Sequence, residues 1–224
     1  MRLVSTMGND RRLRGARFGS ATMLRAGRGV AGLGAVICLL GSLSCNDLVQ
    51  ASRSSTILVI SRIGAAAGGT PDDPINTYLN SDVYFKGLAL PDIGRVSTRL
   101  AFKSPGTSEN PASPTSANWV TVTGYRVVYT RTDGRDRAGV DVPYPFEGGM
   151  TMTTVDIASA EFTLVRAQAK LEQPLISLRN GGGAVRLSVV AEITFFGHDQ
   201  TGAAVNALGT IGINFADWPD PGTI

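Results

Sequence analysis

The chain offers few residues whose type and spacing could do acid–base or nucleophilic chemistry. Its one histidine, His198, lies beside Asp199 in a predicted hairpin turn. A Ser-His-Asp triad needs a base that its partners hold in a walled site, and a turn tip supplies little wall. The sequence also lacks the G-x-S-x-G pattern of hydrolase nucleophiles. We therefore expect no catalytic residue and predict that the protein is not an enzyme.

Metal ligands are also sparse. Zinc sites need several histidine or cysteine side chains, whereas the only cysteines are Cys38 and Cys45, both near the N-terminus. Three carboxylates in one segment, Asp133, Asp136 and Asp141, are weak calcium candidates. Calcium loops favour ligands at alternate positions, and spacings of three and five residues do not follow that pattern. Because arginines are interleaved with these acids, we predict a solvated, salt-linked loop and no cofactor.

Aromatic side chains could form a platform for a sugar or a peptide. In strands such residues more often belong to the core than to a binding surface. Two remain as weak ligand-binding candidates: Trp218, which follows the last predicted strand, and Tyr144, which lies between two prolines. The aromatic residues considered are Trp119, Tyr125, Tyr129, Tyr144 and Trp218.

The residues before Cys45 contain the three parts of an export signal in the required order. Arg25 and Arg28 supply positive charge, residues 30–40 are apolar, and residues 41–44 are small or flexible. Even when extended to Leu43, the apolar run is about 14 residues long, short of the roughly 20 that a transmembrane helix needs. We therefore predict a signal peptide over residues 1–44, and Met23 is an alternative translation start.

The residues around Cys45 resemble the lipobox of bacterial lipoproteins, in which the cysteine thiol is lipidated and the cysteine becomes the new N-terminus. Leu43 lies two positions before the cysteine, and Ser42 occupies the position where leucine is commonest. The tripeptide of residues 42–44 also fits the small-x-small rule of ordinary signal cleavage, as does that of residues 49–51. We predict lipidation of Cys45 and anchoring to a membrane of the bacterial cell envelope, facing the periplasm or the exterior. Plain secretion is the alternative.

The basic charge of the chain belongs to the predicted signal peptide. The whole chain has a net charge of +3. Residues 1–44 hold seven arginines and one aspartate, a net charge of +6, which leaves −3 for residues 45–224. Since a basic surface is the usual mark of a nucleic-acid-binding protein, no nucleic-acid partner is expected.

Residues 45–55 are predicted to be the lipidated cysteine and a flexible tether, and residues 56–218 a β-domain. Apolar residues recur at every second position through this domain, as in half-buried strands. Within residues 185–196, for example, Val189, Ala191 and Ile193 share one face, whereas Ser188 and Glu192 share the other. The predicted strands are residues 56–63, 82–85, 95–103, 119–131, 149–157, 161–166, 185–196 and 205–215, with an extended edge segment at 140–146.

The segments between these strands carry turn signals. The alternation changes phase at Gly124, which predicts a β-bulge. Residues 156–160 are predicted to form a corner, and residues 174–178 a helical turn. Residues 198–202 suit a hairpin in which Gly202 adopts a positive φ.

About eight strands with turns between them predict an all-β fold, an antiparallel immunoglobulin-like β-sandwich of about seven to nine strands. A closed barrel is the alternative. The leader and lipobox, the TILVI strand, the paired GYRVVYTRTDGR and VDVPYPFEGG segments, and the ITFFGHDQTG hairpin are similar to a group of uncharacterised bacterial envelope lipoproteins. This resemblance implies an immunoglobulin-like fold and a surface or periplasmic location, and it brings no activity.

Two classes of function follow from these expectations. The first is a non-catalytic, lipid-anchored envelope module for protein–protein interaction or surface assembly, with a protein partner in the envelope. The alternative is a secreted or anchored module that binds a glycan, a peptide or a small ligand through loops at one end of the sandwich. A pocket with convergent polar groups would favour the second class, and a flat apolar patch or an open sheet edge the first.

Overall fold

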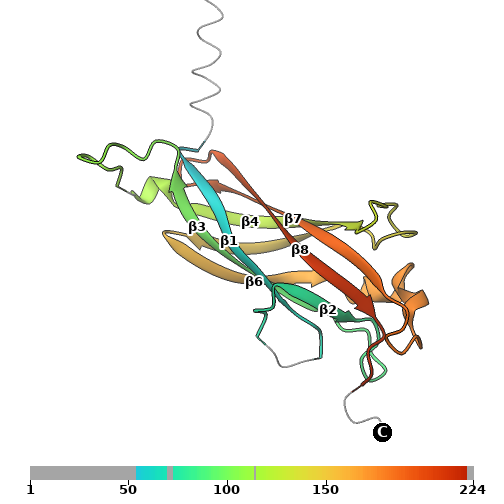
Figure 1. Ribbon diagram of the computed structural model, residues 1–224. Coiled ribbons are helices and arrows are strands. Elements are labelled where there is room, and N and C mark those ends of the chain that lie inside the picture. Colours follow the sequence, from blue (N-terminus) through green and yellow to red (C-terminus); the bar gives the residue numbers. More distant parts are fainter. Residues whose placement is uncertain (1–53, 70–72, 114, 221–224) are drawn as a thin grey trace, which may run out of the picture. The chain divides into compact units, whose positions relative to one another are not determined.

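Figure 1 shows the fold in a computed structural model that describes residues 54–69, 73–113 and 115–220. The predicted signal peptide, Cys45 and residues 46–53 of the predicted tether lie outside the described residues. The strands are β1 (Thr56–Ala66), β2 (Tyr78–Asp82), β3 (Asp92–Phe102), β4 (Val120–Arg131), β5 (Phe146–Thr154), β6 (Ile157–Val165), β7 (Leu187–Asp199) and β8 (Ala204–Ala216). Short 3₁₀ helices are η1 (Ser116–Asn118), η2 (Gln168–Leu171) and η3 (Leu175–Leu178).

The strands form two sheets that enclose one core. The smaller sheet has the order β1-β3-β6, and the larger has the order β2-β8-β7-β4-β5. Aromatic rings join the two layers: Phe162 of β6 meets Phe195 of β7 edge to face, with ring centroids 5.3 Å apart, and meets Tyr125 of β4 at 5.1 Å. The predicted all-β sandwich is therefore confirmed.

One strand pair departs from the predicted antiparallel arrangement. β2 runs parallel to β8, with Tyr78 opposite Gly212 and Asp82 opposite Ala216. The other strand pairs of the described residues are antiparallel. A parallel neighbour requires a long connection, and alternation within a five-residue strand does not reveal its direction.

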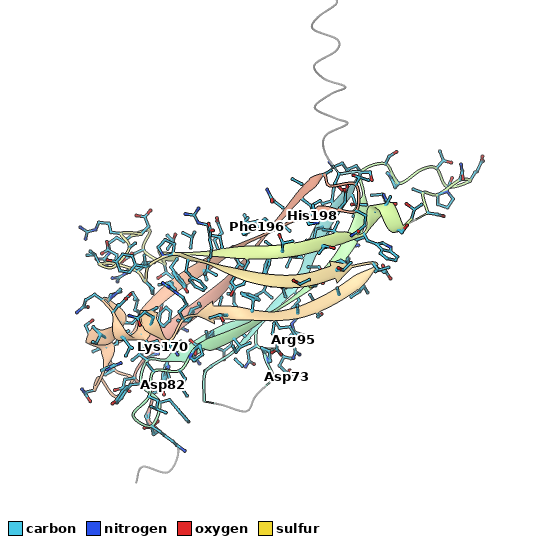
Figure 2. The ribbon with its side chains drawn as sticks, turned by 180° about the vertical axis from the view of Figure 1, so that it is seen from behind. Asp73, Asp82, Arg95, Lys170, Phe196 and His198 are labelled. Atoms are coloured by element: carbon cyan, nitrogen blue, oxygen red, sulfur yellow. The ribbon has the colours of Figure 1, made fainter. Side chains whose placement is uncertain are left out.

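The sandwich has two ends with different connections. The Ser54 end holds Ser54, the connection from β3 to β4, and the β7–β8 turn; Thr56 there donates a hydrogen bond to the carbonyl of Asn118. The Lys170 end holds the β2–β3, β4–β5 and β6–β7 connections. Figure 2 shows His198, near the β7–β8 turn, far from Lys170 and Asp82.

The predicted bulge at Gly124 is confirmed. The register of β4 shifts between Val122 and Gly124 against both of its neighbours, β5 and β7. Val122 and Tyr125 consequently both face the core, although their positions have opposite parity. A Cβ at Gly124 would lie 2.6 Å from Cε2 of Phe196, so the Phe196 ring covers the bulge on the outer face of the larger sheet.

The extended edge segment predicted at residues 140–146 is wrong at residues 140–142, whereas Phe146 does begin the edge strand β5. The carbonyl of Arg137 accepts hydrogen bonds from the backbone N–H groups of Val140, Asp141 and Val142, which makes a compact turn. Gly139 permits this turn because its φ is +73°. Two prolines restrict their neighbours to extended geometry, but they do not decide whether a strand forms.

The boundaries of three other strands also differ from prediction. The predicted strand at residues 82–85 is wrong, because β2 ends at Asp82. The corner predicted at 156–160 lies at residues 155–156, since β6 already begins at Ile157. The predicted helical turn is confirmed as η3, and the predicted positive φ of Gly202 is confirmed at +87°. Among the described residues, no helix is long and apolar enough to span a membrane.

Candidate functional site

The strongest candidate site is a groove on the outer face of the smaller sheet, beside the β1–β2 connection. It consists of two adjoining hollows of about 590 and 480 Å³, and Pro74 and Glu161 line both. Binding pockets for small ligands commonly have volumes of about 300–1,000 Å³. Figure 2 shows Arg95 and Asp73 close together on this side of the molecule.

Three charged side chains meet at the groove. Nη2 of Arg95 lies 2.6 Å from Oδ1 of Asp73 and 2.7 Å from Oε1 of Glu161. The hydrogen bond to Glu161, followed by that to Asp73, raises the pKa of Arg95, so the guanidinium stays charged. Its side chain is 32% exposed, and exposed ion pairs contribute only about 0–1 kcal/mol. A ligand group can therefore replace either carboxylate at low cost.

The two hollows differ in chemistry. The first has an apolar floor that includes Ala66, Leu90 and Ile93. The second is lined by polar groups that include Arg62 and Ser97. An occupant that spans both would place an apolar part in the first hollow and a polar part in the second.

A glycine fixes the wall of the groove. A Cβ at Gly64 would lie 2.3 Å from the carbonyl oxygen of Pro74. The β1–β2 connection thus packs directly on the backbone of β1, at a distance that no other residue type permits. This wall is therefore held in place by contact between two backbone segments. The pattern of side chains in the sequence does not predict such a contact.

A second polar cluster is buried at the Lys170 end. Nζ of Lys170 lies 2.7 Å from Oδ1 of Asp92, and both side chains are fully buried. Oγ of Ser81 donates a hydrogen bond of 2.6 Å to Oδ2 of Asp92, and the N–H of Gly68 donates one of 2.8 Å to Oδ1. The cluster joins the β1–β2 connection, β2, β3 and η2. Because Gly68 also lines the first hollow, the cluster supports the floor of the groove.

Burial dominates the electrostatics of this cluster. Desolvation raises the pKa of Asp92, and the charge and hydrogen bond of Lys170 only partly offset it. Desolvation also raises the pKa of Asp82, against hydrogen bonds from the backbone N–H groups of Tyr84 and Trp218. Burial likewise raises the pKa of Tyr129, whose hydroxyl donates a hydrogen bond of 2.7 Å to the carbonyl of Leu164.

Trp218, a predicted ligand-binding residue, lines a hollow of about 410 Å³ at the Lys170 end. Its indole is half-buried, and Nε1 is buried without a hydrogen-bond partner in the described part of the chain. The Arg186 guanidinium lies 5.7 Å from the ring centroid, and Gly183 lies against the ring edge. Tyr144, the other candidate, is 49% exposed and does not line this hollow.

The three acids proposed as weak calcium ligands are engaged by arginines or exposed. Asp133 receives two side-chain hydrogen bonds from Arg135, of 2.6 and 3.0 Å, which lower its pKa to about 2. Asp141 accepts a hydrogen bond of 2.5 Å from Nε of Arg137, and Asp136 is exposed. The predicted salt-linked loop is therefore confirmed. Within the described residues, no three His, Cys, Asp or Glu side chains are grouped to hold a metal ion.

His198 lies in β7 and not in the turn that was predicted to contain it. It is exposed, opposite Thr121 of β4 and Ala204 of β8. Its neighbour Asp199 is buried, and Oδ1 accepts hydrogen bonds from the N–H of Thr201, the hydroxyl of Thr201 and the N–H of Ala203. Asp199 therefore serves the β7–β8 turn and does not orient the histidine.

Sequence reasoning missed the groove charges and the buried pair. Arg95 and Glu161 are 66 residues apart, and Asp92 and Lys170 are 78 apart. A single residue at each position carries no signal of the other. The alternation of apolar and polar residues in the predicted strand 95–103 indicates only that Arg95 faces outward.

No protein-family model matches this chain, and a search of the curated proteins found no significant match.

Proposed function

We propose that this chain is a non-catalytic module of the bacterial cell envelope, lipid-anchored at Cys45, that binds a partner protein through the groove around Arg95. The observation that carries the proposal is the pair of adjoining hollows with convergent charged groups. Such a pocket favours a peptide ligand over a flat protein surface, and we take the peptide to be a segment of the partner protein. A chain segment of the partner in extended form suits two hollows in series, one apolar and one polar. The exposed ion pairs of Arg95 can exchange a carboxylate for one on the partner.

The order of the strands supports the finer assignment of an immunoglobulin-like fold. Two sheets with three and five strands, closed by the adjacent β7–β8 hairpin and bridged by the β5–β6 connection, resemble the sandwich layout of that class. Loops and sheet faces of such sandwiches are common binding surfaces. The class itself carries no activity, so the function is argued from the groove.

The anchoring at Cys45 is supported by the sequence of residues 23–45. A basic, apolar and small-residue leader ends there in a cysteine, and residues 46–224 contain no further cysteine. Diacylglycerol on one thiol supplies two acyl chains, enough for stable membrane binding. The Cys45→Ser variant should move the protein to the soluble fraction with its folding unchanged. An unmodified Cys45 in the mass spectrum of the mature N-terminus would sink the anchoring proposal and leave a secreted protein.

The groove is tested by reversing its charge. Full-length protein is captured from native membranes after crosslinking, as wild type, as Arg95→Glu and as Arg126→Glu. Arg126 is a matched control, since it also lies opposite a glutamate on the neighbouring strand, Glu147, but on the larger sheet. We expect Arg95→Glu to reduce recovery of the partner at least tenfold and Arg126→Glu to leave it unchanged. Equal recovery with both variants would refute binding at the groove.

The hollow at Trp218 favours a second candidate, a module that binds a glycan or small polar ligand at the Lys170 end. The buried Nε1 of Trp218 lacks an acceptor among the described residues, and Asn180 and Asp217 supply polar groups beside it. Such a ligand should quench or shift the tryptophan fluorescence, and Trp218→Phe should abolish that change. Trp119→Phe is the control, because Trp119 belongs to the Ser54 end.

A further inference from the structure

The Lys170–Asp92 pair places an amine and a carboxyl group in direct contact within the core. Nζ of Lys170 lies 2.7 Å from Oδ1 of Asp92, so the amine nitrogen is held beside the carboxyl group whose carbon it would attack. Both side chains have no exposed surface. Fixing two reactants in this way replaces a bimolecular encounter by an intramolecular step, which accelerates it by large factors.

The carboxyl group of Asp92 is also held by two hydrogen-bond donors. The hydroxyl of Ser81 donates to Oδ2 at 2.6 Å, and the N–H of Gly68 donates to Oδ1 at 2.8 Å. When an amine attacks a carboxyl carbon, negative charge develops on an oxygen, and donors placed beforehand stabilise that charge. Ser81 and Gly68 supply two such donors, one to each oxygen of Asp92.

The dry surroundings favour the neutral product. A buried ion pair recovers its desolvation cost only in part, whereas an amide carries no charge. Burial also raises the pKa of Asp92, which favours the uncharged acid that an amine attacks more readily. Since neither side chain has exposed surface, an amide formed there would be shielded from bulk solvent and its hydrolysis would be slow.

We propose that Lys170 and Asp92 join in an intramolecular amide bond once the domain has folded. The ammonium and the carboxylate first exchange a proton to give the amine and the acid. Nζ of Lys170 then attacks Cγ of Asp92, one N–C bond forms, one C–O bond breaks, and the oxygen leaves with two protons as water. The step is a condensation with no change of oxidation state, so the chain needs no external reagent.

The bond would give the domain a crosslink that its cysteines do not provide. It would tie the start of β3 to η2 across 78 positions of the chain, beneath the floor of the groove. Crosslinks of this kind restrict the unfolded chain, and a long enclosed loop increases the effect. Residues 46–224 contain no cysteine, so a disulfide cannot serve the same purpose.

Mass spectrometry of the full 224-residue chain, made by cell-free synthesis and allowed to fold, tests the bond. We expect a mass one water below that of the sequence, together with a branched tryptic peptide that contains Asp92 and an uncleaved Lys170. The full sequence mass, with cleavage after Lys170, would overturn the proposal. Cyclisation of the Asp133-Gly134 pair would also remove one water, so the Lys170→Arg variant is the reference. A deficit that persists in that variant would place the loss elsewhere and overturn the proposal too.

The role of the donors is tested by comparing two serines. Ser81→Ala removes the hydroxyl from Asp92 and should slow formation of the branched peptide about 10²-fold. Ser97→Ala is the matched control, because the Ser97 hydroxyl lies on the outer face of the smaller sheet, 2.8 Å from that of Ser159. We expect wild-type formation in this control. Equal slowing in both variants would count against reaction at Asp92.

Discussion

Two buried carboxylates, one at each end of the sandwich, are held in opposite ways. Asp199, at the Ser54 end, accepts three hydrogen bonds on one oxygen from residues two and four positions later. Asp92, at the Lys170 end, is bound by groups 11, 24 and 78 positions away. The first is satisfied mainly by its own turn, with one further hydrogen bond from Ser54, and the second by three separate parts of the chain.

The pKa values of the two carboxylates are also shifted in opposite directions. Burial acts to raise the pKa of Asp199, but hydrogen bonds from Thr201, Ser54 and Ala203 outweigh it, so the pKa is lowered. At Asp92 burial prevails and the pKa is raised. The turn, together with Ser54, therefore outweighs the desolvation penalty of its carboxylate, whereas the site assembled from distant segments at Asp92 retains much of that penalty.

The largest loss of folding stability is expected from a substitution at the Lys170 end. Lys170→Met leaves Asp92 buried without its cation, and breaking a buried pair in this way costs about 3–5 kcal/mol. The free energy of unfolding is measured by denaturant titration. Lys170→Met combined with Asp92→Leu should recover the part of the loss that comes from the buried charge, and the part that comes from the proposed amide crosslink should remain. If Lys170→Met cost less than about 1 kcal/mol, the contrast between the two ends would disappear.

The corresponding change at the Ser54 end should cost less. Asp199→Ala removes a carboxylate that accepts three hydrogen bonds, and each bond to a charged group contributes about 1.5–3 kcal/mol. The turn can reopen to water, so we expect a total loss of about 2–3 kcal/mol in denaturant titration. Asp199→Asn keeps one acceptor oxygen and should lose roughly half as much. Equal losses in the two variants would show that the charge is irrelevant to the turn.

Two glycines allow the same comparison, because one is restricted by a distant side chain and the other by its own backbone conformation. Gly94 lies under the Phe162 ring, and a Cβ there would be 2.5 Å from Cζ of that ring. Gly202 has open space but a φ of +87°. Gly94→Ala should cost about 1–3 kcal/mol through overpacking, and Gly202→Ala about 1–2 kcal/mol through backbone strain. Combining Phe162→Leu with Gly94→Ala should relieve the overpacking at residue 94. The same change should leave the cost of backbone strain in Gly202→Ala unaltered.

The smallest effect is the acid dependence due to Asp199. Its pKa is lowered in the folded state, so its stabilisation is present above the unfolded value of about 3.9 and is lost as pH falls through the folded value. For one such group, the free energy of unfolding changes by at most about 1.4 kcal/mol per pH unit. Stability measured between about pH 2 and pH 5 should therefore fall less steeply in Asp199→Asn than in the wild type. An identical slope would mean that Asp199 does not titrate there.

The same contrast explains how much of the molecule could be predicted from the sequence. The β7–β8 hairpin, the Gly124 bulge and the η3 turn were predicted, because each depends on neighbouring residues. The position and the direction of β2 were both wrong, and its direction depends on β8, which lies at the other end of the chain. The Arg95 groove and the Asp92–Lys170 pair were missed for the same reason. Trp218 was singled out because it follows the last strand, and it does line a hollow.

The parallel pairing of β2 with β8 has a consequence for the order of folding. Asn80 pairs with Asn214, which is synthesised 134 residues later. A chain that leaves the cytoplasm N-terminus first, as proposed here, exposes β2 while its partner strand has yet to emerge. Until β8 arrives, β7 also presents an unpaired edge that invites association with other chains. The final strand is thus the step that closes the sheet, and premature termination before Ala204 would leave a secreted fragment prone to aggregation.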